Sequence, residues 1–227
     1  FVPSRGLGDV YKRQIFQGVG QIMDSAKASD RKDAHLALAA APLARSGRSA
    51  GFDRVQLDHC ALPESDLASV SIAKDWLGKT VSAPLFIGSM TGGTDHADAI
   101  NAALATVAER CGVGLALGSQ RAALERGGAS KHLRSLAPSV PLIGNLGGVQ
   151  LAASGGIDLA HRAVDDIEAD ALFIHLNPLQ EAVQPEGETD WRGVLAAIET
   201  LVPRIGCPVI AKEVGAGISA AVARRLY

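Results

Sequence analysis

The chain has few aromatic residues and little net charge, and each shortage excludes a class of partner. Aromatic residues make up 4% of the 227 residues, which leaves little for stacking on nucleic-acid bases. The formal net charge is −2, so the chain lacks the basic footprint of a nucleic-acid-binding protein. No apolar run approaches the roughly 20 residues of a membrane-spanning helix. We therefore expect neither a nucleic-acid partner nor a membrane partner.

Cysteine is also scarce. Cys60, Cys111 and Cys207 are odd in number, lie far apart and lack Cys-x-x-Cys spacing. This pattern excludes a disulfide framework and a zinc site, and it is typical of small buried thiols in a reducing compartment. We therefore predict a cytoplasmic protein. Hydrophobic residues make up 47% of the chain, which is enough for a sizeable core.

The first 22 residues do not fit the rest of the sequence. The stretch 1–14 has neither helical nor strand periodicity, does not begin with methionine and lacks the apolar core of a signal peptide. It resembles translated adapter sequence. We interpret residues 1–22 as a non-native leader and Met23 as a more plausible start.

From residue 84 onward, apolar runs alternate with alanine-rich amphipathic segments. The first four runs recur about every 28 residues, which is the size of one strand–helix step. Alternation of this kind predicts a parallel sheet. The runs predict strands within 85–90, 113–117, 142–143, 171–176 and 208–211, and the segments predict helices over 95–110, 121–136, 155–168, 190–203 and from 218 onward.

The predicted strands end in glycines and small polar residues, as in a (β/α)8 barrel that carries its functional loops at one face. A complete barrel needs eight strands and roughly 250 residues, so five strands predict an incomplete TIM barrel over residues 84–227, with an N-terminal extension. An open doubly wound sheet is the alternative. Gly112 and Gly114 begin a dinucleotide-type glycine pattern, but they precede the strand and the spacing then breaks. We reject that motif.

The stretch His-Leu-Asn-Pro-Leu-Gln-Glu follows the fourth predicted strand. Side chains alternate along a strand, so His175 and Asn177 are expected on one face. Pro178 is expected to end the strand, which leaves Gln180 and Glu181 in the loop. A capped strand end with solvated polar groups would explain any one of these residues. Four polar residues together at the carboxyl end of a barrel strand predict a site.

Three other strand ends carry similar chemistry. Ser89-Met-Thr-Gly-Gly93 offers a hydroxyl group and exposed backbone N–H groups to a ring or a phosphate, although a simple tight turn fits equally well. Gly118-Ser-Gln-Arg121 places a hydroxyl, an amide and a guanidinium group side by side, which suits phosphate binding. Asn145 repeats this pattern after the third strand.

Two charged groups near the strand ends allow more than one role. Lys212 shares a face of an apolar strand with Ile210, so it is expected to be partly buried and to need a partner. It could form a Schiff base, pair with a glutamate or hold an anionic cofactor atom. Glu181, with Glu186 and Glu188 nearby, could bind a hard cation. For the two later glutamates, a solvated loop is the preferred interpretation.

The segment 23–83 contains a cationic cluster, Arg31, Lys32 and His35. If this stretch is helical, Arg31 and His35 share a face. Such a cluster can hold a phosphate group, whereas spacing alone favours a solvated basic turn.

Seven motifs occur in order from about residue 30 to the last residue. They are Arg-Lys-x-x-His at 31–35, Leu-Pro-Glu at 62–64, Met-Thr-Gly-Gly at 90–93, Gly-Ser-Gln-Arg at 118–121, His-Leu-Asn-x-x-Gln-Glu at 175–181, Gln-Pro-Glu-Gly at 184–187 and Lys-Glu-Val-Gly at 212–215. In order and spacing, these motifs together resemble type II isopentenyl-diphosphate isomerase. The resemblance implies an FMN-dependent (β/α)8 enzyme that interconverts isopentenyl and dimethylallyl diphosphate with Mg²⁺, NAD(P)H supplying the reduction.

The resemblance also implies a role for each matching residue. It makes residues 23–83 a substrate-binding segment and the whole enzyme a homo-oligomer, a tetramer or octamer. Contacts with the substrate diphosphate are implied for Arg31, Lys32, His35, Ser119, Gln120 and Arg121. The catalytic groups that line the substrate would be His175, Asn177 and Gln180. FMN contacts are implied for Ser89, Met90, Thr91, Ser119, Asn145 and Lys212, and Mg²⁺ binding for Glu181.

The sequence departs from the family in one respect. The later glycine-rich loops that grip the FMN phosphate have no counterpart here, so we predict that the chain as given is truncated and inactive. Two alternatives stay open. One is another FMN barrel enzyme, such as a 2-hydroxy-acid oxidase, which would need an Arg–His pair late in the barrel. The other is a non-catalytic barrel fragment.

Overall fold

The computed structural model describes residues 49, 51–90, 92–125, 127 and 130–227, and the chain divides into two units, Phe1–His59 and Cys60–Tyr227. The described part of the first unit contains one short 3-10 helix, η2 (Phe52–Arg54), with no buried residue. The second unit contains a further 3-10 helix, η3 (Leu67–Ser69), and the sheet. The predicted leader, the cationic cluster 31–35 and Thr91 lie outside the described residues.

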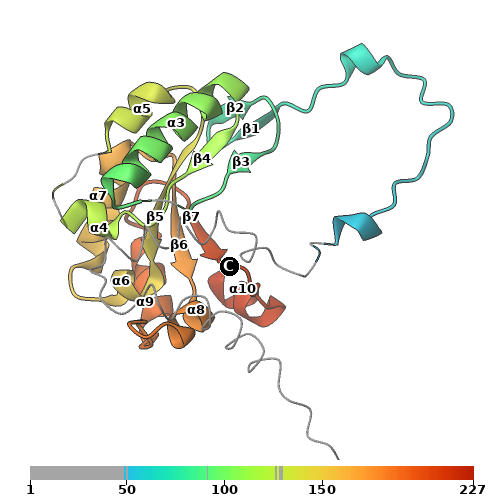
Figure 1. Cartoon of the computed structure of the whole chain (residues 1–227). Helices are drawn as coiled ribbons and strands as arrows, with labels where there is room; N and C mark the ends of the chain where they lie inside the picture. Colours follow the sequence, from blue (N-terminus) through green and yellow to red (C-terminus); the bar gives the residue numbers. More distant parts are fainter. Residues whose placement is uncertain (1–48, 50, 91, 126, 128–129) are drawn as a thin grey trace, which may run out of the picture. The chain divides into compact units, whose positions relative to one another are not determined.

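Five parallel strands form one sheet, and their order in space follows their order in the chain (Figure 1). A doubly wound sheet reverses its strand order at a switch point, whereas a β/α barrel does not. The uninterrupted order therefore confirms part of a β/α barrel, and β3 and β7 are its outer strands in the described part of the chain. The strands are β3 (Phe86–Ile87), β4 (Gly114–Ala116), β5 (Leu142–Gly147), β6 (Ala171–Leu176) and β7 (Val209–Glu213).

Helices connect each strand to the next. The helices predicted over 95–110, 155–168, 190–203 and from 218 are confirmed within a few residues. The single helix predicted over 121–136 is wrong, because two short helices stand there. Gly127 between them has φ +69°, outside the helical range, and glycine disfavours a helix interior. The helices are α3 (Asp95–Cys111), α4 (Arg121–Glu125), α5 (His132–Leu136), α6 (Gly148–Ala152), α7 (Gly156–Ile167), α8 (Pro178–Val183), α9 (Val194–Leu201) and α10 (Ala220–Leu226).

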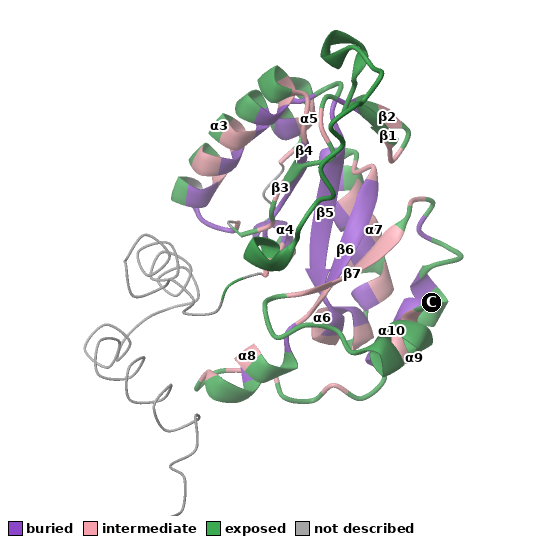
Figure 2. Ribbon diagram, turned by 90° about the vertical axis from the view of Figure 1, so that its right-hand side faces the viewer, coloured by how far each residue is buried: buried purple, intermediate pink, exposed green. Residues whose placement is uncertain are grey.

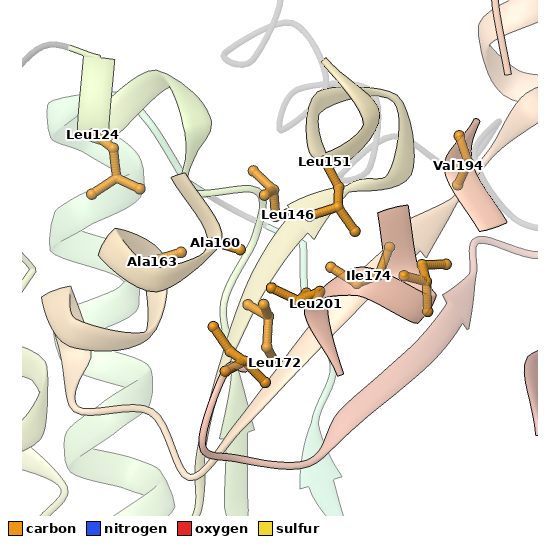
Figure 3. Packing of buried hydrophobic residues seen from close by; sticks show 11 residues of the cluster. Leu124, Leu146, Leu151, Ala160, Ala163, Leu172, Ile174, Val194 and Leu201 are labelled. Atoms are coloured by element: carbon orange, nitrogen blue, oxygen red, sulfur yellow. The ribbon is translucent and has the colours of Figure 1, made fainter. Parts of the chain in front are cut away.

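The connecting helices pack against one face of the sheet. Figure 3 shows Leu146, Leu172 and Ile174 of β5 and β6 in contact with residues of α6, α7 and α9, including Leu151 and Leu201. A second cluster joins β4 and the start of β5 to α3 and α5. A doubly wound sheet would carry helices on both faces. In the described part of the chain, the helices that connect the strands cover one face, which is the arrangement of a barrel wall.

The opposite face, the inner face, is covered at its amino-terminal end by a hairpin of β1 (Lys74–Trp76) and β2 (Lys79–Val81). Leu77 and Gly78 between them both have positive φ, as a type I′ hairpin turn requires. The Trp76 ring stacks on Phe86, with centroids 5.4 Å apart. Trp76 also packs with Phe173 and the other inner apolar residues of β4, β5 and β6. Most residues of β5 and β6 are buried, as the purple ribbon in Figure 2 shows.

An ion-pair cluster fixes the amino-terminal ends of the strands around Asp170. Its Oδ2 accepts a hydrogen bond from Arg134 Nη2 at 2.7 Å and lies 3.3 Å from Lys79 Nζ. The same oxygen accepts from the backbone N–H of Leu142 at 2.8 Å. One carboxylate thus joins α5, the hairpin and β5 just before β6 begins.

The cysteines are only partly as predicted. All three are free thiols. The expectation of buried thiols is wrong for Cys60 and Cys111, which are exposed. Cys111 is the last residue of α3. Cys207 is half-buried, and desolvation, with a smaller contribution from the charge of Asp170, raises the pKa of its thiol. In the described parts of the chain, no helix is long and apolar enough to cross a membrane.

Candidate active site

Four polar side chains stand at the carboxyl end of the inner face, and we call them the strand-end row: Ser89, Asn145, His175 and Lys212. Below them on the same face lie the apolar residues that pack with the hairpin. In the strand register, His175 of β6 stands opposite Lys212 of β7. Because side chains alternate along a strand, Asn145 and His175 continue the face that carries Ile143 and Phe173. The inner face therefore changes from apolar to polar at its carboxyl edge, as it does in barrel enzymes.

Asn145 is the centre of this row. Its side chain is buried, with 3% exposure, and it has partners on three strand ends. The amide nitrogen donates to Ser89 Oγ at 2.6 Å and to the carbonyl oxygen of Leu117 at 2.9 Å. The amide oxygen lies 2.8 Å from His175 Nδ1. One amide therefore connects the ends of β3, β4 and β6.

Gln120 is not brought into the row. Its side chain is buried on the helix-covered side, where Nε2 donates to the carbonyl oxygen of Ala163 in α7 at 2.9 Å. Its Oε1 accepts from the backbone N–H of Asn145 at 2.9 Å. Gln120 thus fixes the backbone of Asn145 against α7. The substrate contact suggested for Gln120 stays a prediction.

A second polar group, the loop cluster, consists of Arg121, Gln150, Asn177, Glu181 and Glu188. The expectation that Glu181 lies in a loop is wrong, and the same holds for Gln180, because both residues are in α8. Pro178 does follow the end of β6, but it also occupies the first turn of the helix, where its missing N–H costs nothing.

Glu181 is held within this cluster by two donors. It is buried, with 9% exposure. Asn177 Nδ2 donates to its Oε1 at 2.7 Å, and the backbone N–H of Glu188 donates to its Oε2 at 2.9 Å. Asn177 also donates to Oε1 of the half-buried Gln180 at 3.2 Å. With one donor on each oxygen, the orientation of the Glu181 carboxylate is fixed.

Sequence reasoning missed the contacts of Glu188. Glu186 is exposed, in agreement with the solvated-loop interpretation, and Glu188 also lies in the connection after α8, with a side chain that is 42% exposed. The Glu188 carboxylate pairs with Arg121 Nη1 at 3.3 Å and accepts a hydrogen bond from Gln150 Nε2. Gln150 was not predicted either. These contacts join residues separated by 67 and 38 positions, so no local sequence pattern predicts them.

Gly147 lets the two groups approach each other. A Cβ atom at this position would overlap the side chain of Gln150 and would lie 3.0 Å from His175 Nε2. The loop cluster and the strand-end row therefore meet where β5 passes into α6, and a side chain at position 147 would require Gln150 to shift.

Two further predicted residues within the described part of the chain, Met90 and Ser119, lie in the segments that follow β3 and β4. Met90 is exposed, and Ser119 is partly buried. Gly92 follows β3, and a Cβ on it would lie 3.2 Å from the carbonyl oxygen of Ser119, so the loops after β3 and β4 pass close together. Among the residues that the structure describes, no group of three His, Cys, Asp or Glu side chains could hold a metal ion.

Lys212 is partly buried, as predicted. Desolvation lowers the pKa of its ammonium group, and the neighbouring Glu213 charge opposes this shift. Glu213 itself accepts backbone N–H groups of Gly215 and Gly217 at 2.7 and 2.8 Å. Although burial acts to raise the pKa of the Glu213 carboxyl, these and the other loop N–H groups lower it.

Replacing Lys212 by methionine is expected to raise the free energy of unfolding near neutral pH. The folded chain holds the Lys212 proton less tightly than the unfolded chain, so wild-type stability increases as pH rises from the lowered pKa toward the unfolded value of about 10.4. The advantage of Lys212→Met should therefore shrink over that range. Urea unfolding at several pH values measures it. The exposed Lys74→Met is the control, and a variant less stable than wild type at pH 7 would contradict the desolvation argument.

The chain is similar to curated proteins of one name. It is 51% identical over 200 residues to the isopentenyl-diphosphate delta-isomerase of Stutzerimonas stutzeri (strain A1501). The aligned region covers 86% of this chain and 58% of that protein. The protein of the same name from Xanthobacter autotrophicus (strain ATCC BAA-1158 / Py2) is 49% identical over 208 residues, covering 90% and 61%. The one from Synechocystis sp. (strain ATCC 27184 / PCC 6803 / Kazusa) is 52% identical over 182 residues, covering 79% and 52%. The chain thus spans little more than half the length of these relatives.

Among solved structures, a (putative) lactate oxidase of Pediococcus acidilactici matches with a TM-score of 0.52 and 12% identity, covering 99% of this chain and 63% of that one. At this identity the likeness concerns the fold alone. No protein-family model matches the chain. By sequence, the chain is a homologue, at about 50% identity, of curated proteins named isopentenyl-diphosphate delta-isomerase.

Proposed function

We propose that this chain carries the catalytic strand ends of an isomerase that interconverts isopentenyl and dimethylallyl diphosphate, of the type that uses reduced FMN and Mg²⁺. The observation that carries the proposal is the identity of about 50% to relatives of that name. The polar carboxyl edge of the sheet supports it, because this is where barrel enzymes place their sites. Reduction by NAD(P)H, a homo-oligomeric state and a cytoplasmic location belong to the same proposal.

The strand-end row fits a flavin. Lys212 brings a half-buried cation to the end of β7, and such a charge favours an anionic ring system. Ser89 and Asn145 supply a hydroxyl and an amide that hydrogen-bond each other at 2.6 Å, and Gly92 lets a loop pass close to the backbone of Ser119. We assign Met90 and its sequence neighbour Thr91 to the flavin as well. When bound, reduced FMN would supply electron density that stabilises positive charge developing on the alkene.

The loop cluster fits a diphosphate with its metal ion. Mg²⁺ is commonly held by one or two carboxylates together with substrate phosphates and water, so one fixed carboxylate, Glu181, is sufficient. Arg121, the first residue of α4, can bind phosphate oxygens, and Ser119 lies two positions before it in the chain. We assign Arg31, Lys32 and His35 to the same anion. Holding the diphosphate at this edge fixes the position of the alkene, and orientation of this kind can account for a large part of a rate enhancement.

Isomerisation requires a proton to be added at one carbon and removed at another. His175, Asn177 and Gln180 are the polar groups that we assign to the alkene end of the substrate. His175 is the one with a ring nitrogen able to hold or accept a proton near neutral pH. Asn177 and Gln180 are amides that hydrogen-bond each other at 3.2 Å, and their role would be to orient the substrate.

A chimaera tests the proposal. The matched 200 residues of the Stutzerimonas stutzeri relative would be replaced by those of this chain, so that the relative supplies the remaining part of its length. We expect the purified chimaera to be yellow and to convert isopentenyl diphosphate into dimethylallyl diphosphate in the presence of Mg²⁺ and a reductant. A folded chimaera with bound flavin but no isomerase turnover would refute the proposed function. Circular dichroism and the flavin spectrum establish folding independently of turnover.

A further inference from the structure

The contacts of Asn145 determine the direction of its side-chain amide. The carbonyl oxygen of Leu117 can only accept a hydrogen bond, and it lies 2.9 Å from the amide nitrogen. The amide NH₂ must therefore face Leu117 and Ser89, since the opposite orientation would set two oxygen atoms against each other. The amide oxygen consequently faces His175.

The direction of the amide in turn determines which ring nitrogen of His175 carries a proton. An amide oxygen is an acceptor without a proton, so the 2.8 Å contact forms a hydrogen bond only when Nδ1 is the donor. In the neutral imidazole, one nitrogen is protonated and the other is not. Nε2, the nitrogen next to Gly147, then carries the lone pair.

Asn145 cannot easily turn away from this arrangement. Its backbone N–H donates to Gln120 Oε1 at 2.9 Å, and its carbonyl oxygen accepts from the backbone N–H of Gln120 at 2.9 Å. Its side chain is almost fully buried between neighbouring strands. Rotation of the amide would leave the carbonyl group of Leu117 without this donor, and an unsatisfied buried polar group is costly.

We infer that Asn145 is a positioning residue that holds His175 in its Nδ1–H tautomer, so that neutral His175 presents Nε2 as an acceptor at the carboxyl edge of the sheet. The role of His175 toward a substrate rests on the proposed function, whereas the tautomer rests on the contacts alone. Through Nε2, a neutral His175 of this kind can accept a hydrogen bond or a proton but cannot donate one.

The tautomer can be measured directly in the ¹⁵N-labelled 227-residue chain. Long-range ¹⁵N–¹H correlation spectra distinguish protonated from unprotonated ring nitrogens, and recording them at about pH 9 keeps imidazoles neutral. His175→Gln identifies the signals of His175. We expect Nδ1 of His175 to appear protonated and Nε2 unprotonated, in contrast to the exposed His132.

Two variants separate positioning from simple packing. Asn145→Leu removes the acceptor and should abolish the protonated Nδ1 signal. Ser89→Ala removes only the second acceptor of the amide and should leave the tautomer unchanged, because Leu117 still orients Asn145. If Asn145→Leu fails to fold, the wild-type and Ser89→Ala spectra still test the inference, because both should show Nδ1 of His175 protonated.

A wild-type His175 protonated at Nε2 would overturn the inference, and so would a tautomer that survives in folded Asn145→Leu. The proposed function is judged separately. An inactive, folded chimaera together with a protonated Nδ1 in this chain would refute the isomerase and leave the assignment of the tautomer in place.

Discussion

Replacing Glu181 by glutamine in the chimaera is expected to abolish most of the Mg²⁺-dependent turnover while leaving FMN bound. Glutamine keeps an oxygen for Asn177 to donate to, so the local hydrogen bond can survive. The charge that would hold the cation is lost. Changes even in groups that only support metal ligands commonly cost about 10- to 100-fold in metal affinity or activity, so we expect at least that loss.

The measurement is isomerase turnover across a Mg²⁺ titration, with the flavin absorbance recorded on the same samples. Glu186→Gln is the matched control. This substitution removes the same charge, and Glu186 is exposed and lies in the same connection between β6 and β7. Equal Mg²⁺ dependence in Glu181→Gln and wild type would show that Glu181 does not hold the cation.

The largest loss of stability is expected from Asp170→Ala. This substitution leaves Arg134 and Lys79 without their carboxylate and the backbone N–H of Leu142 without its acceptor. The side chains of Arg134 and Asp170 are 13% and 17% exposed. Breaking a buried pair typically costs 3–5 kcal/mol, and partial solvent access here points to the lower end, about 3 kcal/mol.

Asp190→Ala is the control for this experiment. Asp190 also forms an ion pair with an arginine, Arg192, at 2.6 Å, but the two side chains are 60% and 90% exposed. This pair lowers the pKa of Asp190 to about 2, yet exposed pairs contribute little to stability. Urea unfolding of the 227-residue chain should therefore separate the two variants. Similar midpoints would mean that the Asp170 cluster is as dispensable as a surface pair.

The sequence is sufficient to predict the parallel sheet because apolar runs and glycine-rich strand ends are local signals. The run 171–176 coincides with β6, and α3 differs from its predicted range by one residue. The same logic predicts that Asn145, His175 and Lys212 share an edge, since carboxyl ends of parallel strands meet. Their hydrogen bonds could not be derived, because they depend on the register between strands.

The rest could not be predicted, because tertiary contacts override local patterns. Pro178 ends one element and begins the next, and only the contacts of Glu181 distinguish a helix from a loop. Gln120 lies within Gly118-Ser-Gln-Arg121, a motif that suits phosphate binding. Its side chain instead forms hydrogen bonds with the backbones of β5 and α7. Glu188 remains partly exposed in a loop, and its contacts with Arg121 and Gln150 could not be foreseen because they join positions far apart in the sequence.

The strand order has a consequence for how the site opens. β5 and β6 are each paired on both sides, whereas β3 and β7 are outer strands in the described part of the chain. Outer strands open locally at a lower free energy than central ones. Asn145 and His175 therefore stand on the most persistent part of the sheet, and Ser89 and Lys212 stand at or beyond the ends of its least persistent strands. A ligand that contacts all four residues of the strand-end row binds only while the outer strands are ordered. Its binding therefore stabilises the outer strands against local opening, and local opening releases the ligand.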